Sequence, residues 1–382
     1  VDRISLETSL PIARLNRLAL QVGQLGQKPL EEKSVALVPK SFLRGVLAHL
    51  LIVPAWVVPP AVLCASLLST FAPIGLKALP AVLGFGIALV NGPKKARPLF
   101  CAILLALAGA TRRAKSVFSA GLAAFLCWLA TRSRCMEPSP AFFNFVSRWV
   151  KDYYTQTALR GCLSDVKPAR TFFGFHPHGC LSAGFTVNGC YNPDFAQTAG
   201  RMAWLCDANL RHKNPGFRLM AEAYRSDMRA IESCGPADFK LQMAQGVNVA
   251  FIPGGFLDAT AFEHGKDVTV LQSRKGFIKY CLQYGYRAHP VYTFGECETY
   301  HTFRGLKSLR MELAKRNVPA LAFFGWPLLP LLPKPSSKIL TYVGAGIDMP
   351  QIAEPTNAEI HHWHQVYVKA LHRVFEDNKV EA

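Results

Sequence analysis

The chain has few acidic residues and few charged residues of any kind. Its 382 residues include 25 Asp and Glu against 43 Lys and Arg, and only 18% of them are charged. No RNA- or DNA-binding motif accompanies the formal net charge of +18, so nucleic-acid binding is not expected. Most of this net charge lies in residues 1–160, which contain 19 basic and 6 acidic residues and so carry a net charge of +13. A basic excess beside apolar segments is typical of attachment to an anionic membrane surface.

The eleven cysteines do not form a metal-binding or disulfide pattern. No Cys-x-x-Cys pair is present, and an odd, scattered set in a long chain predicts reduced thiols. Internal repeats and low-complexity tracts are also absent. The first 44 residues are mixed and polar, so they predict a cytosolic arm rather than a cleavable signal peptide.

Residues 45–76 contain no Asp, Glu, Lys or Arg. About 20 apolar residues are enough to cross a bilayer, and this longer run is interrupted by prolines. The interruptions are Pro54, Pro59, Pro60 and Pro73. A second uncharged run covers residues 78–93. Because basic residues flank the two runs, we expect a membrane-embedded helical hairpin that turns near residues 69–77, with both ends in the cytosol.

Two shorter apolar runs, residues 98–110 and 116–130, are separated and closed by basic residues. Each is short for a full span, so re-entrant or interfacial segments in one leaflet are expected. A buried helix pair of a soluble domain is the alternative. The chain thus divides into an N-terminal arm (1–44), a membrane region (45–135) and a folded domain (142–382).

Strand-like and helix-like segments alternate in the folded domain, which predicts an α/β fold. The predicted strands cover residues 171–175, 247–252, 287–294 and 338–343, and a helix is predicted at 275–284. Near the C-terminus, Ile360, Trp363, Tyr367 and Leu371 recur at helical spacing. They indicate an amphipathic helix that docks on the domain.

The tetrapeptide His176-Pro177-His178-Gly179 follows the first of these strands. Proline fixes its own φ angle, and glycine allows backbone conformations that other residues avoid. The pattern therefore predicts a stiff turn at the end of the strand, from which a histidine side chain can reach a ligand. A neutral imidazole there can act as a general base toward a hydroxyl. Two alternatives remain: a histidine that satisfies a loop carbonyl, and a His-x-His metal site, for which no third ligand at suitable spacing stands out.

A second glycine turn, Pro253-Gly254-Gly255, follows another apolar strand and precedes Asp258. Backbone N–H groups of Gly254 and Gly255 can approach a ligand oxygen closely, as an oxyanion site requires. Asp258 can orient a histidine and stabilise its charged form. The alternative is a tight turn with a solvated aspartate.

Basic residues stand at the start of the predicted helix, where Arg274 and Lys275 precede Gly276. Two cations beside free N–H groups suit an anionic ligand such as a phosphate-bearing coenzyme, although a solvated basic face is the alternative. His361 and His364 lie one turn apart on the C-terminal helix. We interpret them as surface or packing residues rather than metal ligands.

These motifs occur in one order together with others. The blocks are Phe175-His176-Pro177-His178-Gly179, Ile252-Pro253-Gly254-Gly255, Ser273-Arg274-Lys275-Gly276-Phe277, His289-Pro290-Val291-Tyr292-Thr293-Phe294-Gly295-Glu296, Phe324-Gly325-Trp326-Pro327-Leu328-Leu329-Pro330, and His364-Gln365-Val366-Tyr367 through Lys379. The combination resembles the type-2 diacylglycerol acyltransferase family, which includes monoacylglycerol and wax-ester acyltransferases. The resemblance covers roughly residues 142–382.

The resemblance implies an acyltransferase-like mixed sheet flanked by helices and an acyl-CoA-dependent O-acyltransferase of the endoplasmic reticulum and lipid droplets. The implied reaction esterifies a neutral lipid alcohol at a membrane, with diacylglycerol giving triacylglycerol. Monoacylglycerol, a long-chain alcohol and an inactive scaffold are the alternatives. No metal or bound cofactor is implied. The sequence leaves the oligomeric state open, with a homo-oligomer as one option.

For the site, the resemblance implies that His178 is the base, with His176, Pro177 and Gly179 in its turn. Asp258 stands where the family usually has glutamate. Arg274, Lys275 and Gly276 would then bind acyl-CoA. Lysophosphatidate acyltransferases instead use a His-x-x-x-x-Asp pattern. In this chain, the residue five positions after His176 is Leu181, and the residue five positions after His178 is Ala183. Neither is an aspartate, so the pattern is absent.

Overall fold

The computed structural model describes most of the chain beyond residue 136 and one long helix before it. The described residues are 4–6, 40–71, 101–103, 105–106, 116–117, 119–121, 123–124, 137–316 and 320–381. The second arm of the predicted hairpin, residues 78–93, lies outside them. So do most of the N-terminal arm and most of the runs at 98–110 and 116–130.

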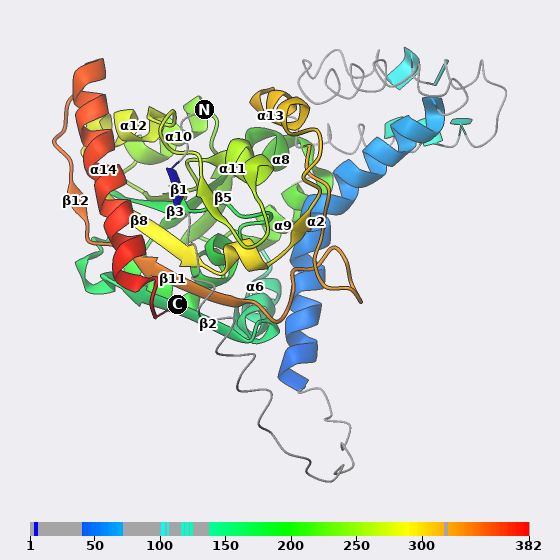
Figure 1. Cartoon of the computed structure of the whole chain (residues 1–382), viewed down its shortest axis with the longest axis horizontal. Helices are drawn as coiled ribbons and strands as arrows, with labels where there is room; N and C mark the ends of the chain where they lie inside the picture. The colour runs from blue at the N-terminus through cyan, green and yellow to red at the C-terminus, as the bar shows by residue number, and fades with distance from the viewer. Residues whose placement is uncertain are drawn as a thin grey trace, which may run out of the picture.

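A mixed sheet forms the centre of the domain and confirms the predicted α/β class (Figure 1). Its strands follow the order β2-β11-β8-β3-β6-β4-β5, and β12 pairs with β8. The five strands from β8 to β5 run parallel, whereas β2 and β11 run in the opposite direction. The bounds are β2 (Gln156–Gly161), β3 (Thr171–His176), β4 (Met202–Cys206), β5 (Arg229–Ser233), β6 (Asn248–Phe251), β8 (Arg287–Phe294), β11 (Lys338–Val343) and β12 (Ile347–Asp348).

Two small antiparallel pairs lie beside the main sheet. They are β1 (Ile4–Leu6) with β7 (Asp267–Thr269), and β9 (His301–Thr302) with β10 (Phe323–Phe324). The strand β7 matters for the site because it carries Thr269.

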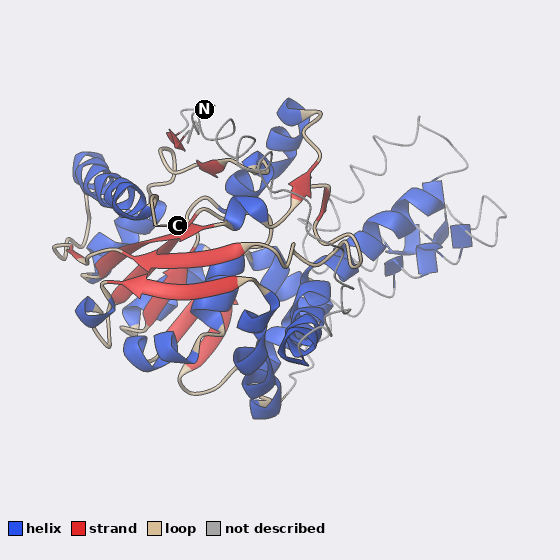
Figure 2. Cartoon of the chain, turned by 60° about the horizontal axis from the view of Figure 1, so that its bottom comes forward, coloured by secondary structure: helices blue, strands red, loops and turns tan. Residues whose placement is uncertain are grey.

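Helices cover both faces of the sheet (Figure 2). One face packs on α10 (Pro236–Ala244), α12 (Gly276–Tyr284) and α14 (Asn357–Asn378). The other packs on α6 (Pro140–Trp149), η3 (Val150–Tyr153), the π-helix η5 (Gly184–Cys190), α7 (Pro193–Ala199) and α9 (Pro215–Tyr224). The remaining helices are η4 (Leu163–Asp165), α8 (Ala208–Lys213), α11 (Gly255–Ala261), η6 (Glu296–Glu298) and α13 (Lys307–Lys315). The strand β3 is buried throughout because it lies between these two layers.

The first long helix, α2 (Lys40–Phe71), packs against the folded domain. Its residues Ala48, Ile52 and Val53 are buried in the same core as α6, η3 and α9. The helix is continuous through Pro54, Pro59 and Pro60, so the interruption predicted at these prolines is wrong. Burial of one helix face in the core offsets the backbone hydrogen bonds that proline cannot donate.

The opposite face of α2 is apolar and exposed. Its exposed large apolar residues are Leu43, Leu47, Leu50, Leu51 and Val58, and Arg44 near the start of the helix is also exposed. Among the described helices, only the α2 stretch Ser41–Pro59 is long and apolar enough to cross a bilayer. The helix therefore presents one face to protein and one apolar face to the surroundings.

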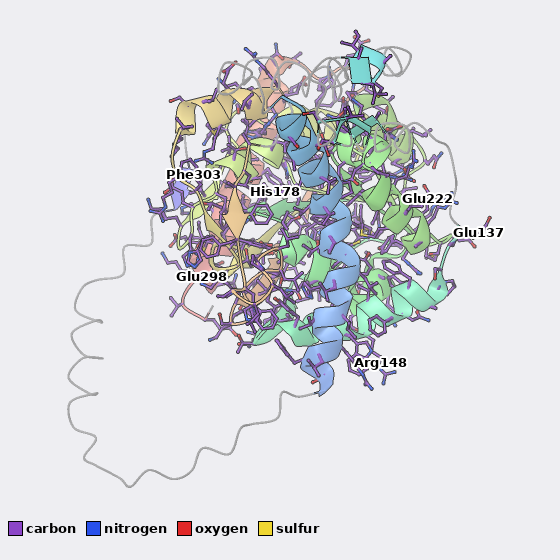
Figure 3. The ribbon with its side chains drawn as sticks, turned by 90° about the vertical axis from the view of Figure 1, so that its right-hand side faces the viewer. Glu137, Arg148, His178, Glu222, Glu298 and Phe303 are labelled. Carbon is purple, nitrogen blue, oxygen red and sulfur yellow. The ribbon has the colours of Figure 1, made fainter. Side chains whose placement is uncertain are left out.

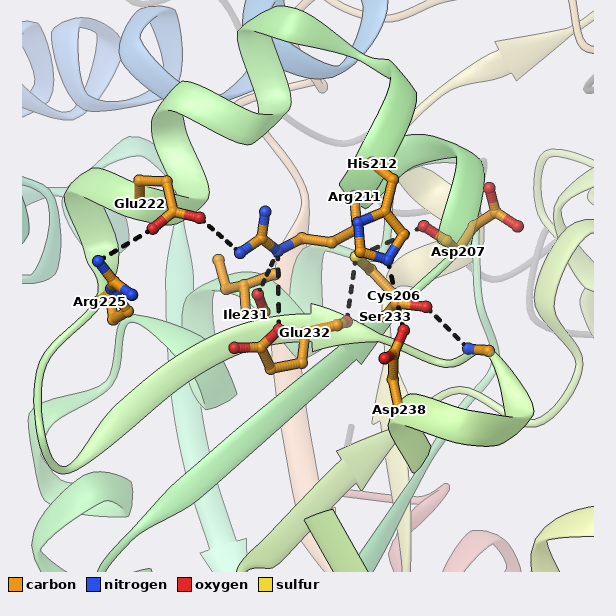
Figure 4. A network of polar contacts seen from close by, with 11 residues as sticks. Cys206, Asp207, Arg211, His212, Glu222, Arg225, Ile231, Glu232, Ser233 and Asp238 are labelled. Carbon is orange, nitrogen blue, oxygen red and sulfur yellow. Dashed lines mark hydrogen bonds and ion pairs between the residues drawn. The ribbon is translucent and has the colours of Figure 1, made fainter. Parts of the chain in front are cut away.

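A buried ion-pair network fixes α9, on which α2 packs (Figure 4). Arg211 bonds Glu222 at 2.6 Å and the Ile231 carbonyl at 2.7 Å. Glu222 also pairs with Arg225 at 3.3 Å. Because Arg211 and Glu222 are each about nine-tenths buried, each charge depends on the other for solvation.

We expect Glu222→Gln to lower the free energy of unfolding by about 2 kcal/mol, since it weakens a charged hydrogen bond in a buried site. Thermal unfolding in detergent micelles measures this change. Exposed Glu312→Gln is the control, because it also loses ion pairs but at the surface. Equal stability of the two variants would contradict the interpretation of the network.

Candidate active site

Three neighbouring parallel strands bring the two predicted turns and one further residue, Glu296, to one edge of the sheet. In the order β8-β3-β6, these strands are followed by Glu296, by His178 and by the turn at Gly254 respectively. Ligands of open α/β sheets bind beyond the carboxyl ends of such strands. The strand order, and not the order along the chain, therefore assembles the site.

The ring of His178 is held by its own turn. Its Nδ1 lies 3.1 Å from the carbonyl oxygen of Gly179, so Nδ1 carries the proton that it donates. In the neutral ring, Nε2 then keeps a free lone pair. Burial lowers the pKa of His178 below 6.5, although backbone hydrogen bonds oppose the shift. The ring is thus neutral at pH 7 and able to accept a proton at Nε2.

Asp258 contacts the backbone of His178 and not its ring, which differs from the predicted orienting role. Its Oδ2 accepts the N–H of His178 at 3.3 Å and the hydroxyl of Thr269 at 3.1 Å. Its Oδ1 accepts the N–H of Val270. Desolvation raises the pKa of Asp258 to about 6, and these donors oppose the shift. The carboxylate therefore holds the His178 turn against β7.

The two glycines of the second turn have different environments. A Cβ on Gly254 would lie 2.0 Å from Cγ of Asp258, so glycine leaves room for the carboxylate. Gly255 has φ +52, a conformation that favours glycine. Its N–H donates to the carbonyl oxygen of Ile252 at 3.2 Å. The N–H of Gly255 is therefore occupied, and the prediction that it faces an oxyanion is wrong.

His176 is buried between two side chains and has no exposed surface. Its Nδ1 lies 3.3 Å from Oγ1 of Thr269, and its Nε2 lies 3.1 Å from the hydroxyl of Tyr367. Burial lowers its pKa to about 3. Because both nitrogens have protein partners, His176 links β3 to β7 and α14, and neither nitrogen is left free for a substrate. His364 is also buried, with Nε2 3.1 Å from the Leu271 carbonyl.

Glu296 is a buried carboxyl group that faces the same turn. It is 1% exposed, and its Oε1 accepts the N–H of Gly184 at 2.5 Å. Its Oε2 would lie 2.4 Å from a Cβ on Gly179, and it has no hydrogen-bond partner. Desolvation raises the pKa of Glu296 to about 8, so the group is neutral at pH 7. Glu296 therefore bonds the start of η5 and lies next to Gly179, where a larger residue would not fit.

Glu296 has no role among the residues predicted from the sequence. One signal was available: it directly follows the glycine that ends an apolar strand, just as the His178 turn follows its strand. Thr269 carried no comparable signal, because β7 is a three-residue strand.

Glu296→Gln should flatten the pH dependence of stability. A carboxyl group whose pKa rises from 4.5 to about 8 on folding binds its proton more tightly in the folded protein. Its contribution to stability is present at low pH and is lost as pH rises toward 8. Between pH 6.5 and 8, wild type should lose roughly 2 kcal/mol through this group, and Glu296→Gln should not.

Thermal unfolding at the two pH values tests this expectation. Asp258, with its pKa near 6, is largely ionised across that window, so it adds little to the slope. Half-exposed Glu298→Gln is the matched control and should keep the wild-type slope. An unchanged slope in Glu296→Gln would show that Glu296 is already ionised.

The family model for diacylglycerol acyltransferase matches residues 127–382. The chain belongs to the diacylglycerol acyltransferase family. It is accordingly an O-acyltransferase enzyme, as the six ordered motifs implied.

Several known members of the family are similar to this chain. Diacylglycerol O-acyltransferase 2 of Dictyostelium discoideum is 29% identical over 248 residues, which cover 61% of this chain and 72% of the relative. Acyl-CoA wax alcohol acyltransferase 1 of Homo sapiens is 29% identical over 276 residues, covering 67% and 81%. 2-acylglycerol O-acyltransferase 3 of Homo sapiens is 29% identical over 251 residues, covering 61% and 71%.

Among solved structures, the 1-acyl-sn-glycerophosphate acyltransferase PlsC from Thermotoga maritima aligns with a TM-score of 0.34 and 14% identity. The alignment covers 74% of this acyltransferase and 98% of that chain.

The remaining predicted residues of this acyltransferase lie at the start of α12. The helix begins at Gly276, one residue after its predicted start, with Lys275 as its N-cap. Nζ of Lys275 lies 3.1 Å from Nδ1 of His361, which is exposed on α14. Arg274 is close enough for its charge to favour the ionised form of Asp258. Within the described ranges, no three His, Cys, Asp or Glu side chains are grouped to hold a metal ion.

Proposed function

We propose that the protein transfers an acyl group from acyl-CoA to the hydroxyl of a neutral lipid, most directly diacylglycerol, to give triacylglycerol. The observation that carries the proposal is the neutral tautomer of His178, whose Nε2 is free to accept a proton at the carboxyl edge of the sheet. The similar proteins support a lipid acceptor by name, since they act on diacylglycerol, 2-acylglycerol or wax alcohol.

In the proposed reaction, Nε2 of His178 takes the proton of the acceptor hydroxyl as the oxygen attacks the thioester carbonyl. The carbon–sulfur bond of the tetrahedral intermediate then breaks. The leaving sulfur receives the proton from the imidazolium, which regenerates the neutral ring and releases free coenzyme A. Asp258 keeps the turn in place through its backbone, and Gly254 remains a candidate donor to the oxyanion. No acyl-enzyme and no cofactor take part.

Acyl-CoA is proposed to place its phosphates at the start of α12, beside Arg274, Lys275 and Gly276. Cations next to unpaired N–H groups at a helix start favour phosphate groups. The acceptor is proposed to arrive from the bilayer along α2, whose exposed face is apolar. We place the protein in the endoplasmic reticulum membrane and on lipid droplets, with the catalytic domain facing the cytosol.

Labelled acyl-CoA and a panel of acceptors test the proposal on the purified full-length protein. The panel contains diacylglycerol, monoacylglycerol, a long-chain alcohol and lysophosphatidate. Label in a neutral ester, absent from the His178→Gln variant, is expected. If no acceptor gives an ester, the proposed activity is wrong and the inactive scaffold is the remaining explanation. If only lysophosphatidate is acylated, the proposal of a neutral lipid acceptor is wrong.

A further inference from the structure

The hairpin at residues 324–332 presents apolar side chains to the surroundings. Exposed turns are usually rich in Gly, Asn, Asp and Ser. Here the exposed side chains include Phe324 (53%), Leu328 (75%) and Leu331 (40%). Residues 317–333 also contain no Asp, Glu, Lys or Arg, although they lie far outside the predicted membrane region. Apolar side chains this close together form a patch rather than scattered surface residues, and such a patch indicates a partner.

The backbone of the hairpin is closed by its own hydrogen bonds. The N–H of Gly325 donates to the carbonyl oxygen of Pro330 at 2.9 Å. At the tip, the N–H of Leu329 donates to the carbonyl oxygen of Trp326 at 3.0 Å. Leu329 packs on the core of the domain, whereas the preceding Leu328 is exposed. The exposed apolar tip is therefore a regular part of the fold.

The hairpin lies beside the first part of α2. The ring of Trp326 contacts the ring of Phe42 edge-on, with centroids 5.9 Å apart. Phe42 directly precedes Leu43, which belongs to the exposed apolar face of α2. Tyr153 joins the two elements, because its ring stacks on Phe42 at 5.8 Å and its hydroxyl donates to the carbonyl oxygen of Pro333 at 2.5 Å. The apolar tip and the apolar face of α2 are therefore neighbours.

Both elements lie near the His178 turn. Figure 3 labels His178 and shows α2 running along that side of the domain. Leu181, three residues after His178, lines a small pocket together with Ile52 of α2 and with Pro333 after the hairpin. A lipid layer that contacts α2 and the hairpin is therefore next to the residues that follow the proposed base.

The charges around the patch indicate which partner it fits. Basic residues, Arg316 and Lys334, stand at the two ends of the uncharged stretch. Apolar side chains bounded by cations match a phospholipid surface, because its phosphate groups lie above an apolar interior. The continuity with α2, whose stretch Ser41–Pro59 is apolar enough for a bilayer, favours the same partner for the hairpin.

We propose that the hairpin inserts Leu328 and its apolar neighbours into the phospholipid leaflet that α2 contacts. The inference rests on the membrane location given under the proposed function, and it adds a contact made by the catalytic domain itself. A domain held by one helix can roll about the axis of that helix. A second contact beside the helix fixes the angle of the domain to the membrane and keeps the His178 turn near the lipid.

Photocrosslinking to lipid tests the inference on the full-length protein in vesicles of tritium-labelled phosphatidylcholine. The photoreactive residue p-benzoylphenylalanine replaces one leucine at a time, and irradiation attaches it to the molecule that it touches. In place of Leu328, it should capture about tenfold more labelled lipid than in place of Leu241. Leu241 is the matched control, because it is an exposed leucine of α10, which covers the other face of the sheet.

A third probe, in place of Leu47 on the exposed face of α2, separates this inference from the proposed membrane location. Lipid captured at Leu47 but not at Leu328, or equally at Leu328 and Leu241, would overturn the inference alone. No lipid at either Leu47 or Leu328 would overturn the membrane location as well. Capture of a second copy of the chain at Leu328, in place of lipid, would overturn the inference and assign the hairpin to a protein interface.

Discussion

His178→Gln is expected to lower the rate of acyl transfer by about 100- to 10,000-fold, the usual contribution of a general base. The structure gives the reason. Nδ1 of His178 is committed to the carbonyl of Gly179, so the lone pair on Nε2 is the part of the ring available to the acceptor hydroxyl. A glutamine amide cannot take up that proton. Ester formation from labelled acyl-CoA by purified protein measures the loss.

The control for this variant is His372→Gln, because the side chain of His372 is more than half exposed on α14. It should transfer acyl groups at the wild-type rate. Thermal unfolding of His178→Gln should match wild type, since the hydrogen bond of the lost ring is to its own turn and glutamine is of similar size. More than a tenth of wild-type activity in a folded His178→Gln protein would place the base elsewhere.

Asp258→Ala should reduce stability and activity together. The change leaves three donors without an acceptor: the buried N–H of Val270, the buried hydroxyl of Thr269 and the partly buried N–H of His178. A loss of about 3 kcal/mol in the free energy of unfolding is expected, because each unpaired group costs roughly 1–3 kcal/mol and some find water. The released turn no longer positions His178, so transfer should fall by about 100-fold.

Measuring both activity and unfolding of Asp258→Ala distinguishes a role in holding the His178 turn from the predicted role in orienting the imidazole ring. If Asp258 instead stabilised the imidazolium, the rate would fall and the stability would not. Asp227→Ala, on an exposed turn, should change neither quantity. An Asp258→Ala protein of normal stability and low rate would contradict the contacts described above.

The local elements of the domain could be predicted from the sequence. The strand at residues 287–294 and the strand at 338–343 have the predicted bounds, because apolar β-formers are enclosed by turn residues there. The helix after Arg274 starts within one residue of its prediction. The His178 turn was found because proline and glycine mark it, and such marks are visible without the fold.

The contacts between elements could not be predicted in the same way. Asp258 was expected on the imidazole, but nothing in the spacing of a turn shows which of its atoms faces a carboxylate. Glu296 comes to the site only because β8 lies beside β3, and strand order is not encoded locally. The prolines of α2 were interpreted as breaks, since the core that holds the helix together is more than eighty residues further along the chain.

The most direct test of the central claim is a structure of the full-length protein with a non-hydrolysable acyl-CoA analogue and a lipid alcohol. The quantity to measure is the distance from Nε2 of His178 to the oxygen of the alcohol. We expect about 2.6–3.2 Å, with the carbonyl of the analogue next to that oxygen and the coenzyme phosphates near Arg274 and Lys275. An alcohol that binds out of reach of Nε2, or a coenzyme on the far side of the sheet, would contradict the account.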